Sequence, residues 1–479
     1  MTSSPHCSIV PPYLLSALAA SDEPRAAGSA RETLRVDELL RRGRVTAEVR
    51  PDPTVDARAG AVPDLAPGTA AGPVRSVHDA GGGTDLPGTG VRAEGDGPSG
   101  DEQVDQAYDG LGATWAMWQE EYARTSLDGK GLPLLATVHY GQDYDNAFWD
   151  GRQMVFGDGD GVVFLPFTRS LDVIAHELAH GVTQYTSGLN YQGQSGALNE
   201  SVSDVFGVLV VQHHLGQSAD EADWLVGADL LAPGVQGVAL RSMKAPGTAY
   251  DDPRLGTDPQ PAHMRDYVAT TADNGGVHIN SGIPNKAFHD LAVALGGNAW
   301  EVAGQVWYDT VVGDIRADCD FATFAGLTLA AASARYGEDS PVVAAVRSAW
   351  TGVGVLPGDE DGGAAADGAQ ADPPVADEEP GDADPTTVRV RRTGGVAGTV
   401  RERTVDLTEL PVDDAHHWRS LLAAGRLRRI AEAARTPDPV RDGFCWTVAC
   451  DAPPLAVDLP ESGLTPEVRG LLDRTVRRD

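Results

Sequence analysis

The sequence is poor in cysteine, with only four in 479 residues: Cys7, Cys319, Cys445 and Cys450. So few cysteines in so long a chain argue against a fold built on disulfides. Cys445 and Cys450 could pair across a hairpin, but reduced thiols are our default expectation.

Positive charge is also scarce. Lysine occurs only at Lys130, Lys244 and Lys286, and the formal net charge is −33 at pH 7. Such a balance argues against nucleic acid or an anionic membrane as a main partner. No apolar run has the length of a membrane span, and segment 1–25 lacks the basic start of a signal peptide. We therefore expect a cytoplasmic protein, and non-classical secretion stays open.

The chain is long enough for two or three domains. Strand-like segments followed by almost continuous helical periodicity predict an α+β domain over 74–356. Residues 357–385 contain ten acidic and no basic residues, which is typical of a disordered linker. The arginine-rich remainder, 386–479, predicts a separate small α+β domain.

One apolar-periodic stretch contains His176-Glu177-Leu178-Ala179-His180. In a helix, residues four apart share a face, so both imidazoles can reach one zinc ion. Glu177 then points beside the metal, toward a bound water. A surface helix that happens to carry two histidines is the alternative at this point.

A second helical stretch opens with Asn199-Glu200-Ser201-Val202-Ser203-Asp204. Glu200 can supply a third ligand, which completes a zinc site whose fourth position is open to water. Asp204 lies one helical turn further on the same face. Its carboxylate can accept the free N–H of a ligating histidine and so fix the ring.

The segment 176–204 resembles the active-site region of the thermolysin family of neutral metalloproteases. Further blocks agree in order and spacing over about 74–355, namely 145–149, 154–161, 240–243 and 273–282. The resemblance implies a two-lobed catalytic domain. A β-rich N-terminal lobe and a helical C-terminal lobe would lie on either side of the zinc helix.

The same resemblance implies the chemistry of the site. His176, His180 and Glu200 would bind one catalytic zinc ion, and Glu177 would be the general base for the zinc-bound water. Two further groups, Tyr191 and His278, would donate hydrogen bonds to the oxyanion, with His278 oriented by Asp273. Taken singly, each of the last three residues is more readily explained as structural, whereas the three together at the family's spacing favour the functional roles.

Substrate-binding residues are implied as well. They are Asn146 and Ala147 for the peptide backbone, Arg241 for a carbonyl on the primed side, and Phe164, Phe167, Val173 and Leu240 for the primed-side pocket. Because that pocket is apolar, we expect cleavage before hydrophobic residues.

The chain departs from the family where a carboxylate cluster binds a pair of calcium ions. Asp172 and Asp223 are kept, but Val211, Leu225 and Ala228 stand at the other matching positions. Calcium takes oxygen ligands, so we expect no double calcium site here.

The N-terminal sequence 6–15, His-Cys-Ser-Ile-Val-Pro-Pro-Tyr-Leu-Leu, resembles the short propeptide of the protealysin subgroup. The resemblance implies a propeptide over 1–73 that makes the chain a zymogen, with maturation near 70–75. An ordinary disordered tail is the alternative. A sharper hypothesis is that the Cys7 thiolate occupies the open zinc position of the precursor, against a purely structural cysteine.

The C-terminal sequences 388–398 and 406–411 are similar to emfourin, a small protein inhibitor of protealysin-like enzymes. A generic arginine-rich binding module is the alternative. If the resemblance holds, a flexible linker of about 30 residues would permit inhibition in cis.

Together these features predict a zinc-dependent endopeptidase that acts on proteins or peptides. Its own propeptide, and possibly its own C-terminal domain, would inhibit it. The rivals are a zinc-retaining binding protein without catalysis and a zinc hydrolase with a non-peptide substrate. Retention of Glu177, Tyr191, Asp273 and His278 argues against the first rival, because scaffolding needs none of them.

Overall fold

The computed structural model describes residues 7–49, 68–69, 71–357 and a series of segments beyond. Those segments are 387–394, 399–407, 410, 418, 445–451, 454–460 and 466–477. The chain divides into two compact units, Met1–Ala365 and Ala366–Asp479. The linker expected over 357–385 lies, apart from its first residue, outside the described residues.

The first unit contains a six-stranded mixed sheet in the order β1-β5-β6-β4-β2-β3. Its strands are β1 (Cys7–Ser8), β2 (Arg75–Asp79), β3 (Thr89–Ala93), β4 (Leu134–Val138), β5 (Ala147–Trp149) and β6 (Met154–Phe156). Strands β2, β4 and β6 run parallel, and the other pairings are antiparallel. The edge strand β1 therefore comes from the far N-terminal segment, and it pairs with β5.

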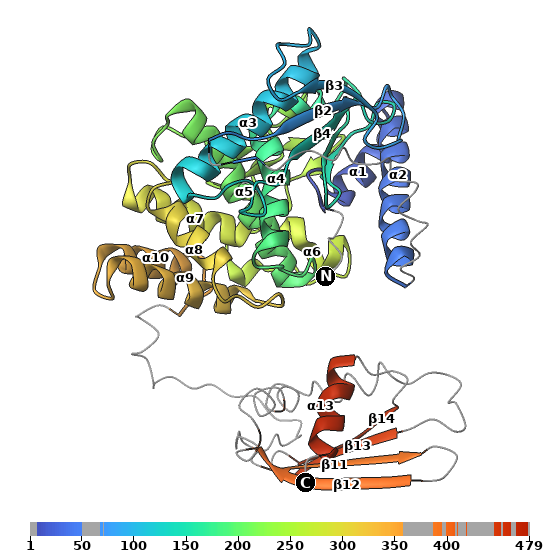
Figure 1. Ribbon diagram of the computed structural model, residues 1–479, viewed down its shortest axis with the longest axis vertical. Helices are drawn as coiled ribbons and strands as arrows, with labels where there is room; N and C mark the ends of the chain where they lie inside the picture. Colours follow the sequence, from blue (N-terminus) through green and yellow to red (C-terminus); the bar gives the residue numbers. More distant parts are fainter. Residues whose placement is uncertain are drawn as a thin grey trace, which may run out of the picture. The chain divides into compact units, whose positions relative to one another are not determined.

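Helices make up the rest of this unit (Figure 1). They include α3 (Glu102–Tyr122), α4 (Leu171–Tyr185), α5 (Gly193–Leu215), α6 (Asp273–Asn280), α7 (Gly282–Leu295), α8 (Ala303–Val312), α9 (Phe321–Tyr336) and α10 (Pro341–Gly352). Two small two-stranded antiparallel sheets, β7 (Leu225–Val226) with β8 (Arg241–Ser242) and β9 (Asp251–Asp252) with β10 (Gly256–Thr257), also belong to it. The expected order of a β-rich part before a helical part is confirmed.

Helices α4 and α5 pack through the middle of the unit, and every residue of α4 from Asp172 to Thr183 is buried. Their close approach depends on Gly207 of α5. A Cβ atom there would lie 2.8 Å from the Asp172 carbonyl oxygen and 3.4 Å from the His176 Cβ. The small residue thus lets α5 approach the expected zinc helix closely.

The N-terminal segment folds onto this unit. Helix α1 (Pro12–Ala19) has proline at its first position, where no N–H is needed, and buries Leu14, Leu15 and Leu18. Helix α2 (Pro24–Val49) follows, and its Thr33 and Asp37 are almost fully buried. Residues 8–37 therefore pack as part of the fold rather than as a loose tail.

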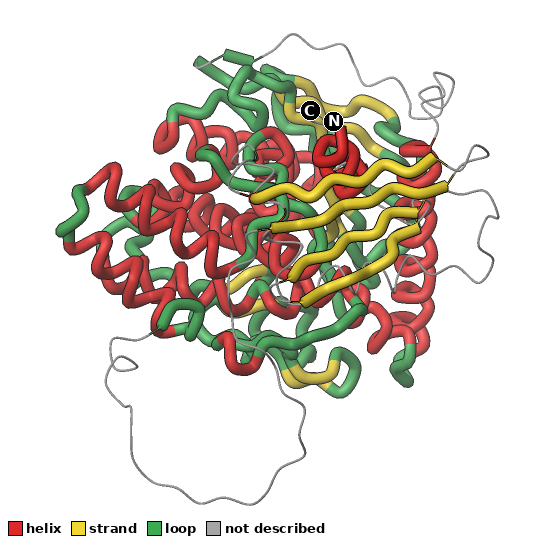
Figure 2. Tube along the Cα trace, turned by 90° about the horizontal axis from the view of Figure 1, so that it is seen from below, coloured by secondary structure: helices red, strands yellow, loops and turns green. Residues whose placement is uncertain are grey.

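The second unit contains a four-stranded antiparallel sheet in the order β12-β11-β13-β14 (Figure 2). The strands are β11 (Thr387–Gly394), β12 (Thr399–Asp406), β13 (Cys445–Asp451) and β14 (Pro454–Pro460), followed by α13 (Pro466–Arg477). Buried Trp418 and Trp446 lie in its core, and the Trp418 Nε1–H donates to Thr475 Oγ1 at 3.0 Å. A small α+β domain was expected here.

Two details of the second unit concern cysteine and membranes. Cys445 and Cys450 lie on the same strand, opposite Pro460 and Leu455, so the hairpin disulfide considered above is wrong. Cys450 is buried and takes part in no disulfide within the described residues. In the described residues of the whole chain, no helix is both long and apolar enough to cross a membrane.

Candidate metal centre and active site

The expected zinc ligands meet in the structure. His176 and His180 project from one face of α4 with their Nε2 atoms 3.1 Å apart. The Glu200 carboxylate of α5 lies 3.6 Å from His176 Nε2 and 3.5 Å from His180 Nε2. Tetrahedral zinc with bonds of about 2.0–2.2 Å separates its ligands by about 3.4 Å. The three residues therefore fit that metal.

Burial and charge agree with this fit. All three side chains are at most 3% exposed. Burial lowers the pKa of His180 to about 4, so its imidazole is neutral and can bind metal at pH 7. Burial alone would raise the pKa of Glu200, but His278, His180 and His176 lower it. Glu200 Oε2 is buried without a hydrogen-bond partner among the described residues, as a ligand atom would be.

The ring nitrogen that faces away from the cluster, Nδ1, has a polar partner in both histidines. His176 Nδ1 lies 2.8 Å from Asp204 Oδ1, as expected, which fixes the ring with Nε2 toward the cluster. His180 Nδ1 lies 2.8 Å from the Asn199 side-chain oxygen and 3.1 Å from Ser203 Oγ. Asn199 was not assigned a role from the sequence, although its place next to Glu200 on α5 could have suggested one.

Asp204 has a second partner that the sequence did not reveal. The Arg241 guanidinium donates to it from Nε at 2.9 Å and from Nη2 at 2.7 Å. Asn285 Nδ2 donates to the same carboxylate at 2.8 Å. Burial alone would raise the pKa of Asp204, but Arg241 and His176 lower it well below its usual range. Arg241, which was expected to bind substrate, is thus linked through the Asp204 carboxylate to His176, one of the expected zinc ligands.

Glu177 is fully buried beside the ligand cluster. Its Oε2 accepts the backbone N–H of Trp149, at the end of β5, at 3.0 Å. Burial and the neighbouring Glu200 carboxylate raise the pKa of Glu177 well above its usual range, while the N–H groups of Trp149 and Ile9 oppose that rise. A raised pKa suits a carboxylate that must accept a proton and later release it.

Tyr191 and His278 approach the cluster at Glu200. The Tyr191 hydroxyl donates to Glu200 and lies 3.1 Å from His278 Nε2. His278 Nδ1 lies 2.6 Å from Asp273 Oδ1, and the His278 N–H donates to Asp273 Oδ2 at 2.9 Å. Burial would lower the pKa of His278, but Asp273 and Glu200 raise it to about 9.

The segment before His278 has an unusual backbone. Asp273, Asn274, Gly275 and Gly276 all have positive φ, between 49° and 84°. A Cβ on Gly275 would lie 2.9 Å from the Gln192 side chain, so glycine is required there for space as well as for φ. Such left-handed runs cost free energy and are typical of functional sites. His278 itself lies in α6, directly after this run.

The residues expected to bind substrate backbone hold the N-terminal segment instead. Asn146 Oδ1 accepts the Val10 N–H at 2.9 Å, and its Nδ2 donates to the Val10 carbonyl oxygen at 3.3 Å. The Ala147 carbonyl oxygen accepts the Ile9 N–H at 3.2 Å. Arg241 Nη1 donates to the Ile9 carbonyl oxygen at 3.1 Å. The chain's own residues thereby lie along β5, where the resemblance places the substrate.

The four residues expected to line the primed-side pocket are all buried. Phe164, Phe167, Val173 and Leu240 are at most 2% exposed and belong to the same continuous core as Ile9. The rings of Phe164 and Phe167 lie 5.8 Å apart, and Leu240 immediately precedes Arg241. Leu240 thereby links these buried apolar residues in sequence to Arg241, which binds the Ile9 carbonyl oxygen.

Helix α2 reinforces this docking through polar contacts. Asp37 accepts hydrogen bonds from the Tyr144 hydroxyl and from Asn146 Nδ2. The Ser29 hydroxyl donates to the Asp145 carboxylate. Burial and the nearby Asp160 raise the pKa of Asp145 well above its usual range. The side chain of Cys7, by contrast, is not described by the structure. The hypothesis that its thiolate occupies the open zinc position therefore stays untested.

The two carboxylates kept from the family's calcium cluster have other partners. Asp172 accepts from the Ser170 hydroxyl and from the Gly227 N–H. Asp223 is exposed and accepts the Leu225 N–H at 3.0 Å. Both therefore have structural partners in the fold, and the absence of a calcium pair stays a prediction.

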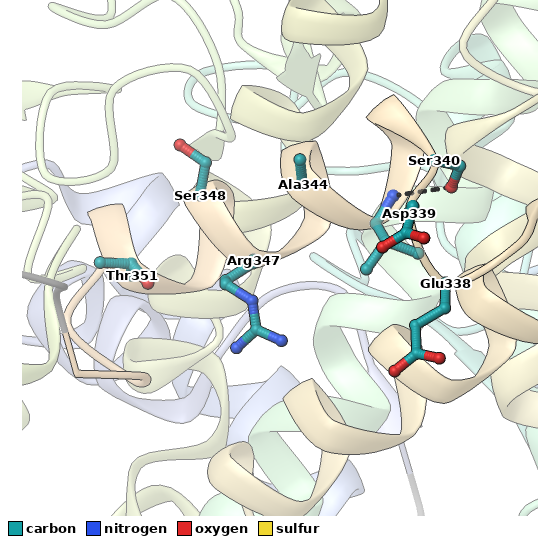
Figure 3. Close-up of a pocket in the computed structure, with 8 residues that line it drawn as sticks. Glu338, Asp339, Ser340, Ala344, Arg347, Ser348 and Thr351 are labelled. Atoms are coloured by element: carbon teal, nitrogen blue, oxygen red, sulfur yellow. Dashed lines mark hydrogen bonds between the residues drawn. The ribbon is translucent and has the colours of Figure 1, made fainter.

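One hollow of about 450 Å³ lies over α10 (Figure 3). It is lined by Glu338, Asp339, Ser340, Val343, Ala344, Arg347, Ser348 and Thr351, none of which belongs to the cluster around Glu200. Its residues include the amino-terminal cap of the helix, where Ser340 Oγ accepts the Val343 N–H at 3.3 Å.

Two histidines and a glutamate around one point, with a buried glutamate alongside, define a zinc metallopeptidase. The chain belongs to the thermolysin family. The family model described as "Thermolysin metallopeptidase, catalytic domain" matches residues 78–184, and the model of its "alpha-helical domain" matches 187–355. The second unit matches the emfourin family over 390–476.

Individual relatives agree with this assignment. An "Extracellular metalloprotease" of Pectobacterium carotovorum is 51% identical over 357 residues, which is 74% of this chain and 98% of that protein. An "Extracellular minor metalloprotease" of Serratia marcescens is 52% identical over 200 residues, 41% of this chain and 56% of that protein. A solved structure, the "Precursor of Protealysin" from Serratia proteamaculans, has 49% identity and a TM-score of 0.65. It covers 73% of this chain and 100% of its own.

One sequence-based expectation is overturned by these relatives. The expected cytoplasmic location is wrong, because relatives that share about half of their aligned residues with this chain are named extracellular metalloproteases. The expectation rested on segment 1–25, which lacks a recognisable signal sequence.

Proposed function

We propose that this metallopeptidase is a latent endopeptidase that cleaves peptide bonds before hydrophobic residues. The observation that carries the proposal is the convergence on one buried point of a ligand cluster, a proton acceptor and two hydrogen-bond donors. Glu177 lies in the same helix as His176 and His180, and His278 Nε2 lies 3.5 Å from Glu200 Oε2.

The residues divide the work of hydrolysis. Zinc, when bound, supplies Lewis-acid chemistry that activates water at neutral pH. Glu177 accepts a proton from that water and delivers it to the leaving nitrogen. His278 and Tyr191 donate to the oxygen on which negative charge develops. Asp273 is a positioning residue, since its two hydrogen bonds to His278 fix the direction of Nε2.

Latency is assigned to residues 1–73 as a propeptide ahead of a catalytic domain over 74–356. The support is that Ile9 and Val10 take up the backbone partners that a substrate would need. The long segment 51–73 then offers a place for the maturing cut.

Substrate preference is assigned to the apolar pocket around Phe164, Phe167, Val173 and Leu240. The matured enzyme should be given a library of peptides with every residue type at each position, and the cleaved bonds read by mass spectrometry. Cleavage before leucine, isoleucine, phenylalanine or valine is expected. A preference for acidic or basic residues after the cleaved bond would contradict the assignment.

The emfourin-like unit, 386–479, is proposed to be an inhibitory module that acts on its own chain or on another copy. Its support is the family match and a linker of about 30 residues, long enough for a high effective concentration. Deletion of 386–479 should raise the peptidase activity of the matured enzyme. Unchanged activity, with the deleted unit also inert when added back in excess, would reject the role.

A further inference from the structure

The peptide bond between Ser8 and Ile9 lies between the groups that would hydrolyse a substrate. His278 Nε2 is 3.2 Å from the Ser8 carbonyl oxygen. On the amide side, the Ile9 N–H donates to the Ala147 carbonyl oxygen at 3.2 Å and also faces the Glu177 carboxylate. Each half of this bond thus lies beside the residue suited to it, a donor for the carbonyl and a proton carrier for the nitrogen.

The direction of the chain is also that of a substrate. Arg241, expected to bind a carbonyl on the primed side, binds that of Ile9 at 3.1 Å. Asn146 then exchanges two hydrogen bonds with Val10. Ile9 therefore stands where the residue after a cleaved bond would stand. It is aliphatic and fully buried, as the proposed preference requires.

Strand β1 fixes the position of the two residues before this bond, Cys7 and Ser8. Its antiparallel pairing with β5 puts Cys7 opposite Trp149 and Ser8 opposite Phe148. Adding a strand to a sheet edge is a common way to bind an extended peptide, because backbone hydrogen bonds fix its position. Backbone contacts on both sides of one bond leave little freedom for a shift by one residue.

We propose that the Ser8–Ile9 bond is the first bond that the zinc-loaded chain hydrolyses, within its own cleft. The inference rests on the proposed peptidase function. One water is consumed: its oxygen bonds to the Ser8 carbonyl carbon, the C–N bond breaks, and both its protons end on the Ile9 nitrogen, with Glu177 as carrier. Ser8 becomes a carboxylate on the released segment 1–8.

This cut does not empty the cleft. The segment that begins at Ile9 continues into α1 and α2 and keeps its own contacts. Asp37 still accepts from Tyr144 and Asn146. The nicked chain therefore stays latent until the connection 51–73 is cut. Activation has two separable steps, of which only the second exposes the primed side.

The experiment starts from the full chain, stripped of metal by a chelator and then given one equivalent of zinc. Intact mass and N-terminal sequence are followed in time at several protein concentrations. A species that begins at Ile9 should appear before any cut near 70–75, with a first-order rate independent of concentration. A first cut at a neighbouring bond, or a rate proportional to concentration, would overturn the proposal.

Three variants sharpen the test. Glu177→Gln should stay intact, and it should stay intact at Ser8–Ile9 when matured wild-type enzyme is added, because the bond is buried. Ser8→Ala keeps every backbone contact and should be cut. Ile9→Pro removes the N–H that faces Ala147 and Glu177 and should not be cut at this bond.

Hydrogen exchange gives a readout without turnover. In metal-free Glu177→Gln, the Ile9 and Val10 amides should exchange slowly, and free exchange there would contradict the register. Casein hydrolysis by the matured enzyme separates the two claims. Hydrolysis of casein without any cut at Ser8–Ile9 refutes this inference alone, whereas absence of both refutes the proposed function as well.

Discussion

Asp204 is the residue whose change tests the site most sharply, because its carboxylate serves two partners. It lies 2.8 Å from His176 Nδ1 and accepts two hydrogen bonds from the buried Arg241 guanidinium. Asp204→Asn keeps the size and one oxygen but removes the charge. The Arg241 cation, 1% exposed, would then lack its counter-ion.

The structure sets the size of both effects. Breaking one partner out of a buried ion pair costs about 3–5 kcal/mol of unfolding free energy. Removing the carboxylate behind a ligating histidine lowers metal affinity by about 10–100-fold. Asp204→Asn should therefore lower the stability of the metal-free protein by several kcal/mol and, separately, weaken zinc binding.

The assay is urea unfolding of the metal-free full chain, followed by tryptophan fluorescence, together with zinc titration against a competing chelator. The matched control is Asp109→Asn, an exposed carboxylate on α3, which should change neither quantity. A loss below about 1 kcal/mol together with a zinc affinity within twofold of wild type would refute the reasoning.

Other predictions concern pH and metal. His139 lies between Asp158 and Asp101, and hydrogen bonds to Asp158 raise its pKa from 6.5 to about 9. The stability that protonated His139 contributes is present below pH 6.5 and is lost as the pH rises through 9. In urea unfolding, His139→Gln should therefore lower the free energy of unfolding by about 1 kcal/mol at pH 6 and by little at pH 10. The figure allows for the partial exposure of the two carboxylates. Ionising the buried Asp145 carboxyl costs stability as the pH rises. The change in unfolding free energy caused by Asp145→Asn should therefore be more favourable at pH 8 than at pH 4, by about 1–2 kcal/mol. An equal change at both pH values would contradict this. Calcium-selective chelation, with zinc kept saturated, should leave the melting temperature unchanged, and a large fall would show a calcium site.

The ligand cluster could be predicted from the sequence because its information is local. His176 and His180 are fixed by helical spacing alone, and Glu200 with Asp204 repeats that logic one helix later. The roles of Tyr191, Asp273 and His278 came from resemblance, and the structure brings all three together beside Glu200.

Contacts between residues far apart in the sequence could not be predicted from helical spacing. The link from Arg241 to Asp204 joins residues 37 positions apart, and Ser8 meets His278 across 270. Neither follows from spacing, since only the folded backbone sets such distances. The error over Cys445 and Cys450 was of the opposite kind. A hairpin of two short strands and a single longer strand show the same alternation of side chains along the sequence. Here both cysteines lie on the single longer strand β13.

The central claim is that this chain is a zinc peptidase in which Glu177 carries the proton. The most direct measurement is casein hydrolysis by the zinc-loaded, matured chain, compared with Glu177→Gln prepared in the same way and shown to bind one zinc. We expect hydrolysis by the first and a loss of activity of at least about 100-fold in the second. Equal activity of the two, or none in either with zinc fully bound, would contradict it.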